Sequence, residues 1–200
     1  LVLTAPGDWR VLQSLRAVAS QHQLAIDLRD DSHFFSTVRE FAEHAKGRKQ
    51  LRLEYWYREL RHKHGILMDG KQPLGGQWNF DADNRKPPPK TLNVPDTYKA
   101  PVDAVVTEVT HLVAREFPDH FGDLDPFHFA VTREGALQAL DQFMTERLAL
   151  FGDYQDAMVQ GEPWLYHSHI GLYLNCGLLT PLECITRTEA AYHAGLAPLN

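Results

Sequence analysis

The sequence predicts an α/β segment followed by an all-α segment, joined by a stretch rich in proline. The first 28 residues alternate a short apolar run, a helical apolar pattern and a second short apolar run. Residues 69–101 are rich in Gly and Pro, and after residue 102 apolar residues recur every three or four positions. The domain limits that follow are 1–68 for the α/β segment, 69–101 for a linker and 102–200 for the helical segment.

The two apolar runs at the start of the chain are residues 1–4 and 24–28. Asp8 can cap a helix that begins at Trp9, because its carboxylate accepts hydrogen bonds from the free N–H groups of a first turn. A strand, a helix and a strand in this order predict a parallel pair. Since two strands are too few for a stable parallel sheet, further strands are expected before Leu1.

A long amphipathic helix is predicted near residues 36–64, with a possible break at Gly47. Basic residues outnumber Glu54 and Glu59 along its second half. One interpretation is a solvated face with cations that favour a helix C-terminus, and the other is a local basic surface near DNA or a cofactor. The basic residues are Lys46, Arg48, Lys49, Arg52, Arg58, Arg61 and Lys63.

Residues 69–101 have the composition of a loop, and Pro87–Pro89 favour a polyproline II conformation. A loop of this length is usually functional or a linker between domains. The remainder of the chain is predicted to be helical. Thr180-Pro181-Leu182-Glu183 is typical of a helix start, and that helix should reach about Ala194, with Gly195 as its stop.

Composition narrows the class of protein. The chain has 200 residues and a net charge of −6, so a DNA partner would need a local basic face. Cys176 and Cys184 fit no metal-binding or redox spacing and are expected to be buried, reduced thiols. The histidines are scattered, and no metal site is predicted. No apolar run reaches the roughly 18 residues that a membrane span requires, which favours a cytoplasmic protein without a membrane partner.

The most informative stretch is GDYQDAMVQGEPWLYHSHIGLYLN, residues 152–175. Gly152-Asp153-Tyr154 reads as a turn that ends one helix, and Tyr166-His167-Ser168-His169 reads as the entrance to another. The free N–H groups and the dipole at a helix entrance form a site for phosphate. The alternative is that Ser168 is only an N-cap.

This stretch resembles the FAD-binding region of the photolyase/cryptochrome superfamily, most closely the deoxyribodipyrimidine photolyase-related branch that includes bacterial iron–sulfur (6-4) photolyases. A second block, residues 47–90, supports the resemblance through the unusual run GGQWNFDADNRKPPPK. The resemblance implies that this chain is an internal fragment. It would hold the later half of a Rossmann-like α/β antenna domain, a Pro-rich linker and the start of a helical FAD-binding domain.

The resemblance also implies the cofactor-binding residues. Tyr154 would contact the phosphate or ribityl part of FAD, and His167, Ser168 and His169 match a Thr-Ser-Arg-like run that surrounds the FAD phosphates in other photolyases. Asn175 is a further polar candidate. His169 stands where relatives often carry Arg, and a histidine supplies less fixed charge at neutral pH. Binding would then depend more on backbone donors.

The function implied for the full-length protein is light-driven repair of UV-induced pyrimidine lesions in DNA by a flavin-dependent lyase. Damaged DNA and FAD would be its partners, a lumazine antenna and a four-iron four-sulfur cluster possible further cofactors, and the protein would be a monomer. The alternatives are a blue-light sensor without repair and a helical interaction module without a cofactor. No catalytic residue and no cluster ligand is predicted within this chain, so the fragment alone should be inactive.

Overall fold

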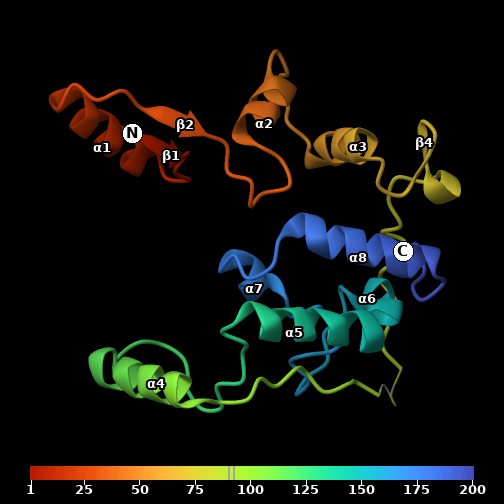
Figure 1. Cartoon of the computed structure of the whole chain (residues 1–200). Coiled ribbons are helices and arrows are strands. Elements are labelled where there is room, and N and C mark those ends of the chain that lie inside the picture. The colour runs from red at the N-terminus through yellow and green to blue at the C-terminus, as the bar shows by residue number, and fades with distance from the viewer. Residues whose placement is uncertain (90, 92) are drawn as a thin grey trace. The chain divides into compact units, whose positions relative to one another are not determined.

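The computed structural model describes residues 1–89, 91 and 93–200, so Lys90 and Leu92 of the predicted linker lie outside the described residues. The fold is mixed, mostly helical with small sheets, as the sequence predicts in outline (Figure 1). Contacts divide the chain into two compact units, Leu1–Lys71 and Gln72–Asn200. Two short strands flank this division, with β3 (Met68–Asp69) ending the first unit and β4 (Gln72–Pro73) starting the second.

The first unit begins with the predicted strand–helix–strand arrangement. Its elements are β1 (Val2–Thr4), α1 (Trp9–Gln21) and β2 (Asp27–Arg29). The strands are parallel, with Leu3 paired to Leu28, and the Asp8 carboxylate accepts a hydrogen bond from the Arg10 N–H at the start of α1. Local capping and the rule for short crossovers are therefore enough to predict this part of the fold.

Two helices replace the single helix predicted near residues 36–64. They are α2 (Val38–Ala45) and α3 (Leu53–His64). Thr37 and Glu40 form a reciprocal capping box at the start of α2, and Gly47 takes a positive φ of 72° in the segment between the helices. A left-handed residue cannot continue a right-handed helix, so the interruption comes at the glycine that the sequence marked as a possible break.

Most of the basic residues named for this region are paired within the unit. Arg48 forms an ion pair with Glu59 at 2.8 Å, and Arg58 with Glu54 at 2.7 Å. Lys63 pairs with Glu40. Arg61 is buried and donates to the backbone carbonyls of Ile66 and Leu67. These contacts favour the interpretation as a solvated, internally paired face over that of a free basic surface.

The second unit is built from helices. They are α4 (Ala104–Glu116), α5 (Arg133–Glu146), α6 (Leu148–Tyr154), α7 (Gly171–Asn175) and α8 (Pro181–His193), with one 3₁₀ turn at Leu74–Gly76. Ion pairs from Arg133 to Glu183 and from Arg187 to Asp141 join α8 to α5. The Thr180 hydroxyl accepts from the Glu183 N–H, Pro181 is the first helical residue and Gly195 has a φ of 73°, so the predicted helix start and stop are confirmed.

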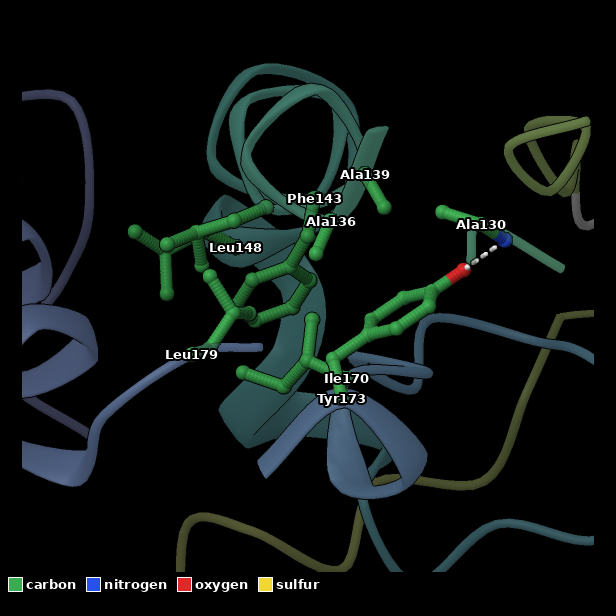
Figure 2. Close-up of a cluster of buried hydrophobic side chains, with 9 residues drawn as sticks. Ala130, Ala136, Ala139, Phe143, Leu148, Ile170, Tyr173 and Leu179 are labelled. Atoms are coloured by element: carbon green, nitrogen blue, oxygen red, sulfur yellow. Dashed lines mark hydrogen bonds between the residues drawn. The ribbon is translucent and has the colours of Figure 1, made fainter. Parts of the chain in front are cut away.

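The core of the second unit lies where α5, α6 and α7 meet (Figure 2). The side chains of Leu140 and Leu179 are completely buried, and Phe143 and Tyr173 pack with them. The Tyr173 hydroxyl accepts a hydrogen bond from the Ala130 N–H at 3.1 Å, which ties α7 to the segment before α5. Apolar packing thereby fixes the loop that leads into α7. This loop carries the predicted site residues His167, Ser168 and His169.

The two cysteines are free, and Cys176 is exposed at the end of α7 while Cys184 is partly buried. The expectation that both are buried is therefore wrong for Cys176, because it lies beyond the last apolar turn of a short helix. Burial raises the pKa of the Cys184 thiol, which keeps that group protonated at neutral pH.

Within the described residues, no helix combines the length and the apolar character needed to cross a bilayer.

Candidate functional site

Tyr154 and Tyr166 form the centre of the candidate site. Tyr154 is the last residue of α6, and its ring lies against that of Tyr166, with centroids 5.8 Å apart and planes tilted by 33°. Tyr166 is buried, and its hydroxyl donates to the backbone carbonyl of Asn93. Burial raises the pKa of the Tyr166 phenol, so this group stays a neutral donor. The ring pair holds the end of α6 next to the loop before α7.

His169 links two distant parts of the same unit. Its Nε2 lies 2.8 Å from the carbonyl oxygen of Trp164, and its Nδ1 lies 3.1 Å from the hydroxyl of Thr97. A neutral imidazole satisfies both contacts when Nε2 donates and Nδ1 accepts from the hydroxyl. Burial lowers the pKa of the ring, which favours this neutral form. His169 therefore uses both nitrogens within the protein.

Arg147, at the junction of α5 and α6, holds Pro95 and Asp96, the two residues that precede Thr97 in the same stretch. It is 2% exposed, and one guanidinium nitrogen donates to the backbone carbonyls of Pro95 and Asp96. The Gln142 amide also donates to the Asp96 carbonyl, at 3.0 Å. Residues 93–97 are thus fastened to the helical unit by the side chains of Gln142, Arg147, Tyr166 and His169.

Ser168 is not a helix cap, so that prediction is wrong. Helix α7 begins at Gly171, and Ile170 stands at its N-cap position with no side-chain cap among the described residues. Leu165 and His169 both take positive φ angles, 43° and 55°, and such residues cannot continue a helix. The entrance that the sequence suggested is an irregular loop, held by the contacts of His169.

Polar groups on this loop and at the end of α6 are available to a ligand. The side chains of Tyr154, His167 and Ser168 are partly buried, and within the described part of the chain none of them has a hydrogen-bond partner. Asn175 is exposed at the end of α7 and makes no polar contact with the other four predicted residues.

Sequence reasoning missed Arg147, Thr97 and the structural role of Tyr166. In the sequence FMTERLALF, residues 143–151, Arg147 follows Glu146 and precedes an apolar run, and this local pattern does not indicate a buried cation. The partners of Tyr166 and Thr97 are about 70 residues away in sequence, and no local pattern indicates such contacts.

A cavity of about 620 Å³ lies elsewhere, between α2 and α3 in the first unit. Its wall includes Trp56 and the buried His44, whose Nδ1 lies 2.9 Å from a carboxylate oxygen of Glu59. Arg48 and Lys63 in the same wall are already paired with carboxylates. A charged ligand would have to displace these pairs, so the loop before α7 is the stronger candidate. Among the described residues, no cluster of His, Cys, Asp or Glu could hold a metal ion.

Residues 1–129 match the family model described as deoxyribodipyrimidine photo-lyase-related protein. The chain belongs to this family. It is also similar to a (6-4) photolyase of Agrobacterium fabrum (strain C58 / ATCC 33970), with 46% identity over all 200 residues. The chain spans 39% of the length of that relative.

The family match and the alignment with the (6-4) photolyase cover different lengths of this photolyase-related chain. The family match ends at residue 129, before α5, whereas the alignment with the (6-4) photolyase continues through the loop that carries His167, Ser168 and His169. Similarity to a photolyase therefore extends over both units and includes the candidate site.

Proposed function

We propose that the full-length protein containing this chain is a flavin-dependent DNA photolyase, and that the loop before α7 forms part of its FAD site. The observation that carries the proposal is the group of Tyr154, His167 and Ser168, whose polar side chains have no partner among the described residues. They lie in a chain of the photolyase-related family, 46% identical to a (6-4) photolyase.

The donor set suits the phosphate end of FAD. A phenol, a hydroxyl and an imidazole can each donate to a phosphate oxygen. Asp153, which precedes Tyr154, would repel a phosphate, but the Lys86 ammonium lies 2.9 Å from its carboxylate and offsets that charge. Ser168 lies in a loop whose irregular backbone can direct N–H groups outward, so backbone donors would supplement the side chains.

The residues of this chain would bind and orient FAD and would not themselves take part in the reaction. Tyr166 holds Tyr154 through its ring, and His169 fixes the loop by its bonds to Thr97 and the Trp164 carbonyl. When bound, FAD would supply the light-driven electron transfer that the repair reaction uses. Asn175 remains a proposed polar contact of lower rank, because it is exposed and apart from the other candidates.

Damaged DNA is the proposed substrate, with the pyrimidine lesion turned out of the base stack. A lumazine antenna and a four-iron four-sulfur cluster are proposed for the full-length protein by family resemblance. The chain contains only two cysteines, Cys176 and Cys184, so the four cluster ligands would come from other parts of the protein.

The test is made on purified full-length protein. Its absorption spectrum should show bound flavin, and blue light should restore an oligonucleotide that carries a (6-4) lesion. Tyr154→Phe should weaken FAD binding, whereas Tyr192→Phe, which removes a hydroxyl on α8 that also lacks a partner among the described residues, should not. Bound flavin without repair would favour the alternative of a blue-light sensor. A folded protein without flavin would favour the alternative of a helical interaction module without a cofactor.

A further inference from the structure

Arg147 is a buried cation whose guanidinium is directed at backbone carbonyls. Its exposure is 2%, and no carboxylate in residues 1–89, 91 and 93–200 forms an ion pair with it. Neutral carbonyls of Pro95 and Asp96 accept its hydrogen bonds, and its buried Nε has no partner within the same ranges. Glu146 and Asp96 attract the charge only from a distance.

A buried charged arginine lowers the stability of the folded protein unless an anion lies near it. Burial penalises the charged form of the guanidinium, yet arginine remains protonated in proteins, so the charge persists. Two carbonyl dipoles offset part of the penalty, and an unsatisfied buried N–H adds to it. A positive charge of this kind raises the affinity of an adjacent surface for an anion, because low dielectric strengthens its field.

The surface next to Arg147 is the candidate site. The guanidinium is close enough to Tyr166 and His169 for its charge to act on both. Tyr166 in turn packs on Tyr154 and precedes His167 and Ser168. His169 contributes no charge of its own, because it is bonded as a neutral ring on both nitrogens. Among the described residues of the second unit, Arg147 is therefore the one cation that is held in place by burial.

We propose that Arg147 is the electrostatic positioning residue of the flavin site, holding residues 93–97 in place and supplying the buried positive charge that favours the FAD diphosphate. This inference rests on the proposed function. It predicts that Arg147 discriminates between two ligands. Loss of its charge should weaken the binding of FAD, which carries the diphosphate. The binding of riboflavin, which has the same ring system without phosphate, should not change.

The experiment compares FAD and riboflavin affinities of the full-length protein after removal of its flavin, measured by flavin fluorescence. Arg147→Gln keeps an amide donor for the carbonyls and removes the charge. We expect FAD affinity to fall roughly tenfold or more with riboflavin affinity unchanged. Gln142→Ala is the matched control, because it removes a neutral donor to the same Asp96 carbonyl, and it should leave the ratio of the two affinities at the parental value.

Each outcome has a distinct meaning. If the parental protein binds no FAD, the proposed function fails. If the parent binds FAD and Arg147→Gln binds it equally well, the inference fails and the proposed function stands. Equal losses for FAD and riboflavin assign Arg147 a structural role only and overturn the inference. Should Arg147→Gln not fold, Arg147→Lys must keep the parental preference for FAD, and loss of that preference, or failure of both variants to fold, overturns it as well.

Discussion

The Tyr166 hydroxyl donates to the backbone carbonyl of Asn93, a contact between residues 73 positions apart in the sequence. This bond joins the loop before α7 to an extended segment that the sequence assigns to a linker. With the bonds of Arg147 and His169 to the same segment, it makes residues 93–97 part of the scaffold of the candidate site. The limits 1–68, 69–101 and 102–200 remain a proposal for the full-length protein.

Tyr166→Phe removes this bond and keeps the ring that packs on Tyr154. We expect a loss of about 0.5–1.5 kcal/mol in the free energy of unfolding, the usual net value of one hydrogen bond. Denaturation with urea measures the loss, and amide hydrogen exchange should quicken in residues 93–97 first. Tyr98→Phe removes the bond from Tyr98 to Gln138 and is the control, since it should leave exchange near Asn93 unchanged. Equal exchange at Asn93 in parent and Tyr166→Phe would contradict the assignment.

Leu140→Ala should be among the most destabilising changes in the second unit. Leu140 is completely buried between α5 and its neighbours, so truncation leaves a cavity that costs about 2–5 kcal/mol. Leu182→Ala, at a side chain that is 54% exposed on α8, should change stability by less than about 0.5 kcal/mol. The two variants are compared by chemical denaturation, and similar costs for both would show that the core lies elsewhere.

Stability should decrease on acidification through His169. Burial lowers the pKa of His169 in the folded protein, so the unfolded chain binds a proton more readily as the pH falls. The contribution of the neutral ring is complete above the unfolded pKa of about 6.5 and is lost as the pH falls below that value. His169→Gln should reduce this acid sensitivity in unfolding experiments between neutral and mildly acidic pH. A variant as acid-sensitive as the parent would exclude His169 as the titrating group.

Ser168→Ala separates binding from stability. Because Ser168 does not cap α7, the variant should keep the parental melting temperature without flavin. If the hydroxyl contacts a phosphate of FAD, affinity in the full-length protein should fall by about 1.5–3 kcal/mol.

Thr180→Ala is the opposite control for this experiment. The Thr180 hydroxyl caps α8, so its removal should cost about 1 kcal/mol of stability and leave FAD affinity unchanged. Parental FAD affinity in both Ser168→Ala and Ser168→Gly would show that the Ser168 side chain does not contact the phosphate, and that backbone donors or Tyr154 bind it.

The chain by itself should bind FAD weakly or not at all, while the full-length protein binds it well. A cofactor site has to enclose most of its ligand, and the candidate residues here form one loop and one helix end. Flavin that co-purifies in stoichiometric amount with residues 1–200 would disprove this expectation.

Local signals predicted the elements whose ends depend on local chemistry. Asp8 and Thr180 cap the helices that follow them, and Gly195 ends α8, because each of these interactions spans only a few residues. Ser168 had the same residue type as a cap, but its neighbour His169 is held with a positive φ by Thr97 and Trp164. The contact with Thr97 joins residues 72 positions apart, and no local window of the sequence contains it.

Arg147 shows the same limit for the site. Its place between Glu146 and an apolar run gives no sign of burial, and its contacts are with Pro95 and Asp96, which lie 52 and 51 positions earlier in the sequence. The family resemblance indicated the loop of residues 167–169 as the candidate site. The buried positive charge of Arg147 became visible only in the structure.

The paired cations Arg48, Arg58 and Lys63 have a consequence for the DNA binding that is proposed for the full-length protein. A cation strengthens attachment to DNA mainly when it takes the place of condensed counterions on the phosphates. Arg48, Arg58 and Lys63 already face carboxylates, so each would have to leave Glu59, Glu54 or Glu40 before it gained a phosphate. The salt dependence of DNA affinity should therefore be almost the same in the protein with all three of these residues changed to Gln.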